Sequence, residues 1–260
     1  MSWWQGLVLG VVQGLTEFLP ISSSGHLVVV QELIGFNNAG VFVEVVLHVA
    51  TLLAIVVVYR ARIVSLANGL VRGDIDSIRY IGLIMIATIP AGAIGILFQD
   101  AIESSFGSLR VVGLNFLFTG VILWSSLATR PKPKCSVGLP AAVVAGFAQA
   151  LAILPGISRS GSTIVGAMWL RVDPVRAAEF SFLMAIPVIG GAGVLQLGKL
   201  SGATIAGSPF PLMIGFAAAL VSGVFAIRVL VRLLIRQQFH RFAGYCWLLG
   251  IVVISWSFYK

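Results

Sequence analysis

The chain has 260 residues, of which 58% are hydrophobic and only 10% are charged, and its formal net charge is +8. An ordinary soluble domain carries about 25% charged residues, so this composition excludes a soluble enzyme, a disordered chain and a nucleic-acid-binding domain. One membrane crossing needs about 20 apolar residues. We therefore expect an all-α polytopic membrane protein.

The first 34 residues do not fit a simple crossing. Residues 1–16 are uncharged, but Glu17 and Pro20 then interrupt the apolar run. A polar stretch, Ser22-Ser-Ser-Gly-His26, leads into a second short apolar run that ends near Ile34. We interpret this region as a re-entrant hairpin of two half-helices. Its polar turn at membrane depth requires surrounding protein or a water-filled cavity.

Three segments that are long enough to cross follow, at roughly 41–59, 80–98 and 111–129. Residues 137–158 are again uncharged, until Arg159 interrupts them. Only 11 residues separate Arg159 from Arg171, and as a helix they would rise about 16 Å, half of a ~30 Å hydrocarbon core. This region therefore predicts a second hairpin. Three further crossings are expected at roughly 178–198, 209–227 and 242–259.

The two interrupted regions are similar to each other. At an offset of 136 positions, residues 10–25 and 146–161 share seven identical residues of 16, including the polar pairs Gln13/Gln149, Ser22/Ser158 and Ser24/Ser160. This similarity indicates an internal duplication within one membrane domain, roughly 1–130 and 137–260, each half being a hairpin followed by three crossings. Because three is odd, the halves should have inverted topology, with the hairpin tips meeting near the midplane.

The basic residues predict an orientation. Of the 17 Lys and Arg residues, 13 fall in the segments 60–79, 130–136, 171–177 and 228–241. The positive-inside rule makes this the cytoplasmic side. Both termini are therefore expected outside, and the first hairpin should enter from outside.

Of the other four basic residues, Arg110, Lys199 and Lys260 fall on the opposite side, and Arg159 lies inside the apolar layer. An Arg at the membrane centre costs about 2.5–3.5 kcal/mol on insertion scales, so it needs a partner or a ligand. Its planar guanidinium suits phosphate oxygens, and a half-helix that begins near Ser160 adds backbone N–H groups. Ser158, Ser160 and Thr163 add hydroxyl donors. The alternative is a structural ion pair with one of three acidic residues, Glu17, Glu44 and Glu179.

The first tip carries candidate nucleophiles and a candidate base. Ser22, Ser23 and Ser24 offer hydroxyl groups, and His26 can act as a general base or acid. The alternatives are helix capping for the serines and a buried neutral imidazole for His26.

Gln13 and Glu17 lie four residues apart and share a helix face. A carboxylate and an amide oxygen together can hold a hard divalent cation. The alternative for Glu17 is a partner of His26 or Arg159. Glu44 and His48 are also four residues apart, and they are expected either to line the same cavity or to pair with each other.

Two motifs resemble the signatures of the undecaprenyl-diphosphate phosphatases, the bacitracin-resistance family. They are QGLTEFLPISSSGH, from Gln13 to His26, and PGISRSGST, from Pro155 to Thr163. The resemblance extends over essentially the whole chain. It implies hydrolysis of undecaprenyl diphosphate to undecaprenyl phosphate and inorganic phosphate in the bacterial inner membrane. This reaction recycles the lipid carrier of cell-wall synthesis and confers bacitracin resistance. The resemblance also implies a divalent cation, Mg²⁺ or Ca²⁺.

The resemblance assigns roles to residues of this sequence. Glu17 would be the essential acid and a metal ligand, Ser23 the nucleophile, His26 the acid/base and Arg159 the phosphate clamp. The residues that would assist in phosphate binding are Ser22, Ser158, Ser160 and Thr163. Two positions depart from the usual pattern. Many members carry Glu where Gln13 stands, which weakens its share in metal binding, and many carry Gln at His48, which argues against an obligatory proton role there.

Two other functions stay open at this point. A lipid-phosphate transporter or flippase could use the same inverted repeat, but transport does not require Ser23 and His26. An intramembrane serine protease would need neither Arg159 nor a metal. The expected partners are a polyprenyl diphosphate and membrane lipids, and a homodimer is left open.

Overall fold

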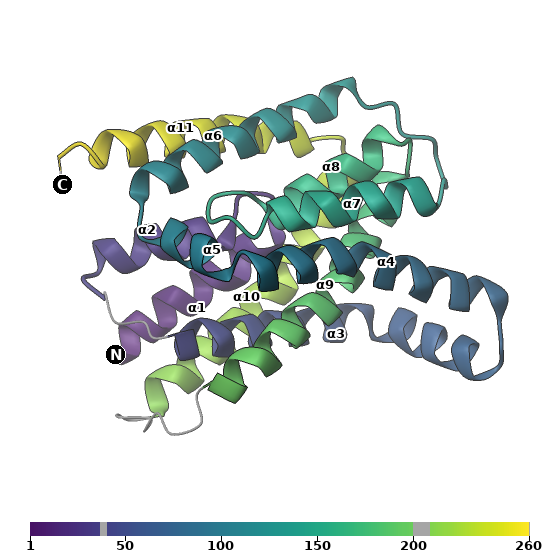
Figure 1. Cartoon of the computed structure of the whole chain (residues 1–260), viewed down its shortest axis with the longest axis horizontal. Helices are drawn as coiled ribbons and strands as arrows, with labels where there is room; N and C mark the ends of the chain where they lie inside the picture. The colour runs from purple at the N-terminus through teal and green to yellow at the C-terminus, as the bar shows by residue number, and fades with distance from the viewer. Residues whose placement is uncertain (37–40, 200–208, 260) are drawn as a thin grey trace.

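The computed structural model describes residues 1–36, 41–199 and 209–259, which form helices and no strand (Figure 1). Within these ranges, six helices are long and apolar enough to cross a membrane. They are α3 (Val41–Val71), α4 (Ile75–Leu97), α6 (Leu109–Ser125), α9 (Pro174–Lys199), α10 (Phe210–Ile235) and α11 (Phe242–Trp256). The all-α class is confirmed, and the described part of the chain has six helices of spanning length and composition where the six crossings were expected.

Four shorter helices form two consecutive pairs. The first pair is α1 (Trp3–Phe18) with α2 (Ser23–Leu33), and the second is α7 (Leu139–Leu151) with α8 (Arg159–Trp169). The helices α2 and α8 have 11 residues each, and a helix of that length rises about 16 Å, well short of a ~30 Å hydrocarbon core. A further short helix, α5 (Gln99–Phe106), precedes α6.

Helices α3 and α10 extend further than the sequence predicted. Helix α3 bends at Tyr59, where φ is −99° and ψ is 16°, and then continues to Val71. The loop expected over 60–79 therefore shrinks to a short turn at 72–74, and most of the loop expected over 228–241 belongs to α10. The apolar windows end before these helices do. The helices continue past the apolar layer with Arg residues, whose long side chains let their charged groups reach water.

The turn between α3 and α4 has its own signals. Gly73 adopts a φ of +71°, the left-handed region that glycine favours. Asp74 then caps α4 by accepting hydrogen bonds from the Ser77 backbone N–H at 3.0 Å and the Ser77 hydroxyl at 2.6 Å. These bonds lower the pKa of the exposed Asp74 carboxyl.

Glycines let the short helices pack closely against crossing helices. In α1, a Cβ at Gly10 would overlap the backbone of Gly215 in α10, and in α7 a Cβ at Gly146 would lie 2.8 Å from the Ala87 carbonyl oxygen in α4. Small residues at such interfaces allow the backbones to approach, as is usual between membrane helices. Each short pair is thus fixed to a long helix, which positions the turn within the pair.

Both ends of the described chain lie at the same end of the molecule (Figure 1). The turn at 72–74 and the segment 130–138 lie at the opposite end. Backbone hydrogen bonds join that segment to the turn after α8, from Lys132 N to Arg171 O and from Asp173 N to Cys135 O. Segments that carry much of the positive charge therefore gather at the end away from the termini.

Candidate active site

The turn that follows α1 meets the turn that precedes α8. The Gly156 N–H donates to the Ser22 hydroxyl at 3.1 Å, and the Ser160 hydroxyl donates to the Leu19 carbonyl at 3.3 Å. Gly25 lies against Gly156 so closely that a Cβ on Gly25 would come within 2.9 Å of the Gly156 Cα. The two polar motifs, which are offset by 136 positions in sequence, therefore form one site.

Backbone strain accompanies this contact. Ser22, the N-cap of α2, has a φ of 70°, which is uncommon for a residue with a side chain. Gly156 has a φ of 97°, which glycine adopts without strain, and its carbonyl accepts a hydrogen bond from Thr119 of α6 at 2.8 Å. Strained residues persist where their surroundings hold them, and they cluster at functional sites. Here the Ser22 hydroxyl accepts hydrogen bonds from the backbone N–H groups of Gly156 and Gly25, and these bonds stabilise the strained conformation of Ser22.

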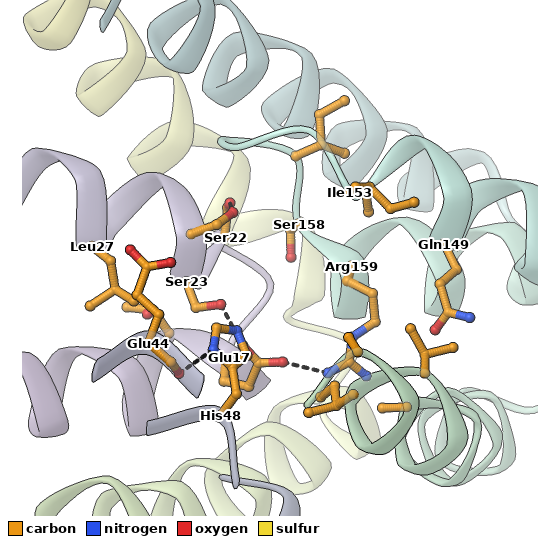
Figure 2. Close-up of a pocket in the computed structure, with 18 of the residues that line it drawn as sticks. Glu17, Ser22, Ser23, Leu27, Glu44, His48, Gln149, Ile153, Ser158 and Arg159 are labelled. Atoms are coloured by element: carbon orange, nitrogen blue, oxygen red, sulfur yellow. Dashed lines mark hydrogen bonds and ion pairs between the residues drawn. The ribbon is translucent and has the colours of Figure 1, made fainter. Parts of the chain in front are cut away.

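A buried ion pair joins the two motifs. Arg159 Nη2 lies 2.6 Å from Glu17 Oε1, and the two side chains are 14% and 6% exposed (Figure 2). The other carboxylate oxygen of Glu17 accepts hydrogen bonds from the Ser23 hydroxyl and from Gln13 Nε2. The hydroxyl of Ser23 is thus held by the same carboxylate that neutralises Arg159.

The three acidic residues have different partners. Of the three candidates for Arg159, the structure selects Glu17. Glu179 instead pairs with Arg62, whose Nε lies 2.9 Å from Glu179 Oε1. Glu44 accepts a hydrogen bond from Gln31 at 3.3 Å.

His48 lies beside the ion pair. Its Nδ1 donates to the Glu44 carbonyl at 2.8 Å, and its Nε2 stands 3.9 Å from Glu17 Oε2. Both Glu44 and His48 line the cavity, as their helical spacing led us to expect. The proximity of His48 to Glu17 was not predicted, because no sequence signal fixes how α3 packs against α1.

His26 does not face Ser23 in the manner expected of its general base. The imidazole Nδ1 donates to the Ser22 carbonyl and Nε2 accepts from the Tyr245 hydroxyl, both at 2.7 Å. The ring stacks on Tyr245 and contacts the edge of Phe116. Because α2 directs the ring between α6 and α11, both ring nitrogens are engaged away from the Ser23 hydroxyl.

A cavity of about 300 Å³ opens beside these groups. Its polar lining comprises Thr16, Glu17, Ser22, Ser23, Ser24, Glu44, His48, Gln149, Ser158 and Arg159. Among the predicted phosphate-binding residues, Arg159, Ser22 and Ser158 reach this cavity. Ser160 and Thr163 are buried outside the lining, where the Thr163 hydroxyl donates to the Arg159 carbonyl at 2.7 Å. These two residues brace the start of α8.

Arg159 keeps donors for a ligand. Its Nη1 donates to the Ser181 carbonyl at 3.3 Å and its Nη2 donates to Glu17. A guanidinium has five N–H donors, so these two bonds, the ones formed with described residues, leave others for an anion in the cavity.

The groups beside Arg159 include candidate ligands for a divalent cation. Within the described part of the chain, no three His, Cys, Asp or Glu residues group together as a protein-only metal cage. Gln13 turns its amide nitrogen, not its oxygen, toward Glu17, so the expected pair of oxygen ligands is not formed. Glu17 and Glu44 nevertheless reach the cavity. Mg²⁺ is commonly held by one or two carboxylates together with substrate phosphates and water, and this donor set fits that mode.

Comparison with known proteins gives consistent matches. Residues 6–252 match the family described as "Bacitracin resistance protein BacA". The chain is 39% identical over 266 residues to an undecaprenyl-diphosphatase of Parabacteroides distasonis, covering 100% of both chains. It is 40% identical to one of Salinibacter ruber, covering 96% of this chain and 97% of the relative. It is also 38% identical to one of Methanobrevibacter smithii, covering 97% of each.

Proposed function

The chain belongs to the bacitracin resistance protein BacA family, and from that premise we propose that it is an undecaprenyl-diphosphatase. It hydrolyses undecaprenyl diphosphate to undecaprenyl phosphate and inorganic phosphate, as a multi-pass enzyme of the bacterial inner membrane. The observation that carries this function is the Glu17 carboxylate, which holds the Ser23 hydroxyl and the Arg159 guanidinium at one cavity. A nucleophile, a base and a fixed cation are what phosphoryl transfer requires. Lipid-phosphate transport, the alternative function, is not favoured by the names of the relatives.

The proposed architecture is an inverted repeat of two hairpins and six crossings. At the offset of 136, the starts of α1 and α2 at residues 3 and 23 correspond to 139 and 159, where α7 and α8 begin. The end of α2 at residue 33 corresponds to 169, where α8 ends. Helix pairing follows the same relation, because α1 packs on α10 and its counterpart α7 packs on α4. These matches support the repeat and a meeting of the two tips near the midplane.

The cavity is proposed to open to the outer side, where both termini would lie. Beyond the tips, its lining includes Glu44 near the start of α3, Phe106 before α6 and Gly193 late in α9. The opposite ends of these elements carry Arg72, directly after α3, Arg130, after α6, and Arg176, in the first turn of α9. Basic residues mark the cytoplasmic side, so this lining supports an outward opening. The prenyl tail would then lie among the helices, with its diphosphate at the tips.

In the proposed reaction, the Ser23 oxygen attacks the terminal phosphorus while its proton passes to Glu17. The bond from that phosphorus to the bridging oxygen breaks, and undecaprenyl phosphate leaves. Water then attacks the phosphoserine, the phosphorus bond to Ser23 breaks, and inorganic phosphate departs as the hydroxyl regains a proton. Arg159 and the N–H groups at the start of α8 stabilise the charge on the transferred group.

A divalent cation, when bound by Glu17 and Glu44 together with phosphate oxygens, supplies further charge neutralisation. His26 acts by positioning, since its ring holds the strained Ser22 carbonyl next to Ser23. Attack by water with Glu17 as the base is the other route to the same products. A phosphoserine trapped at Ser23 separates the two routes.

The function is tested by phosphate release from undecaprenyl diphosphate in detergent, where no transmembrane gradient exists. Wild type should release phosphate, and a chelator should abolish this. Ser23→Ala should lower kcat by about 10³-fold or more if the covalent route operates. Arg159→Lys should lower kcat/KM by about 10²-fold, because Lys lacks the planar fork.

Ser24→Ala is the matched control for Ser23→Ala. Ser24 lines the same cavity, but its hydroxyl pairs with Ser22 at 3.4 Å and not with Glu17. Ser24→Ala should keep phosphatase activity within about threefold of wild type, the small effect that is usual for a substitution that breaks no essential contact. Near-normal turnover by Ser23→Ala would exclude the covalent route, and absence of phosphate release by wild type would exclude the function itself.

A further inference from the structure

Gln149 of α7 is a buried polar residue for which the reaction above has no use. Its side chain lines the cavity, yet the residue is only 2% exposed. Neither amide atom has a hydrogen-bond partner among residues 1–36, 41–199 and 209–259. Buried polar groups are nearly always hydrogen-bonded, so an amide whose two ends are unpartnered at a cavity indicates a partner that binds from the cavity.

The position of Gln149 indicates the charge of that ligand. In Figure 2, Gln149 and Glu17 lie on either side of Arg159, and Glu44 lies beyond Glu17. The carboxylates repel an anion and the guanidinium attracts it. When the terminal phosphoryl group of a diphosphate lies at Ser23, the adjoining phosphate is therefore drawn to the side of Arg159 where Gln149 projects.

We propose that Gln149 is a substrate-binding residue whose amide N–H donates to a diphosphate oxygen beside Arg159. Its amide oxygen accepts from a water that accompanies the phosphate. This inference rests on the proposed function, because it takes the diphosphate as the ligand.

The corresponding glutamine of the first motif shows the contrast. Gln13, 136 positions earlier, donates its amide to Glu17 at 3.1 Å. Gln149 has no such carboxylate, because Ile153 stands where Glu17 stands in the first motif. Helix α7 is held by the close contact of Gly146 with Ala87, so the backbone that carries Gln149 is fixed in place before the ligand arrives. Such preorganisation reduces the entropy lost on binding.

The test replaces Gln149 by Met, which has a similar length and no hydrogen-bonding group. A structural hydrogen-bond partner would destabilise the protein when removed, whereas an unpartnered amide would not. Gln149→Met should therefore keep or raise the thermal unfolding midpoint. It should also raise the KM for undecaprenyl diphosphate by about 10-fold or more, the expected loss of a hydrogen bond to a charged group.

Ser162→Ala is the matched control. Ser162 is also buried, at 5% exposure, and its hydroxyl also lacks a partner among the described residues, but it does not line the cavity. Its substitution should leave both the unfolding midpoint and KM near the wild-type values. Gln149→Asn keeps the amide on a shorter side chain and should raise KM by a smaller factor than Gln149→Met; an equal rise in both variants would count against binding by the amide.

A binding measurement separates this inference from the proposed function. Inorganic pyrophosphate should raise the unfolding midpoint of wild type and of Ser162→Ala, and this shift should be smaller in Gln149→Met. A wild-type KM and an unchanged pyrophosphate shift in Gln149→Met would overturn the role of Gln149, and so would a lowered midpoint without ligand. Failure of wild type to hydrolyse undecaprenyl diphosphate would count against the proposed function alone, since the pyrophosphate shift is read without turnover.

Discussion

The ion pair between Glu17 and Arg159 makes a quantitative prediction about stability. The substitutions are Glu17→Gln, which keeps the shape and removes the charge, and Arg159→Met, which keeps the length and removes the charge. Each single change leaves one buried group without its opposite charge. The double change removes both charges together. The double variant should therefore lose less stability than the sum of the losses in the two single variants.

The magnitude follows from the burial of the pair. Breaking a buried ion pair by removing one partner costs about 3–5 kcal/mol. Arg159 is 14% exposed at a cavity and Glu17 is 6% exposed, so we expect the lower end, about 3 kcal/mol for each single variant. The double variant should lose about 3–4 kcal/mol rather than the sum of about 6, which gives a coupling energy of at least about 2 kcal/mol.

The assay is denaturant unfolding in detergent, followed by the fluorescence of the six Trp residues. The pair Arg62 and Glu179 provides the control, because its side chains are 39% and 28% exposed. The same cycle there should give a coupling of at most about 1 kcal/mol, as for exposed pairs. Additive effects of Glu17→Gln and Arg159→Met, within about 0.5 kcal/mol, would refute the argument that burial makes this pair an energetic unit.

Three further predictions concern the surroundings of the site. Gly156→Ala should destabilise the protein by about 1–3 kcal/mol, because φ is +97° and the new Cβ would overlap α6. Gly92→Ala should not destabilise the protein, because the space around a Cβ at Gly92 is open. Equal unfolding midpoints of the two variants would contradict this prediction. His48→Gln should retain phosphatase activity within about tenfold, while Glu17→Gln should lose about 10²-fold or more, as expected for loss of a general base; comparable losses would make His48 essential. Hydrogen bonds from the Ser77 hydroxyl and N–H lower the pKa of the Asp74 carboxyl from its usual value of 3.8. This helix cap therefore stabilises the protein above that pH and weakens as the pH falls through the lowered pKa. The unfolding midpoint of Asp74→Asn should lack this part of the acid dependence.

Much of the fold follows from apolar length and its interruptions. A crossing helix needs a fixed number of apolar residues, so six segments could be located from hydropathy alone. The short helices could be located because Glu17 and Arg159 interrupt otherwise apolar runs. The helix ends could not, since the arginines at 60, 62, 228 and 232 continue their helices past the apolar layer. Charge predicts where a side chain meets water, and it does not predict where a backbone stops being helical.

The candidate site divides in the same way. Glu17, Ser23 and Arg159 were predictable because charge and hydroxyl groups at membrane depth require a reason. The surroundings of His26 were not, because its orientation depends on Tyr245, which lies 219 residues away in sequence. Gln149 was visible in the sequence only as a repeat match to Gln13. Its free amide depends on the absence of a carboxylate at position 153, and that consequence requires the three-dimensional packing of α7.

The proposed repeat also explains why the two tips carry different chemistry. At the offset of 136, Ser23 corresponds to Arg159, and each is the first residue of its short helix. Glu17 corresponds to Ile153, and both line the cavity. Two copies of Glu17 would place two carboxylates around one anionic substrate, and two copies of Arg159 would repel each other across the contact. A symmetric backbone brings the tips together, but a phosphatase site arises only when one tip supplies the nucleophile with its base and the other supplies the cation.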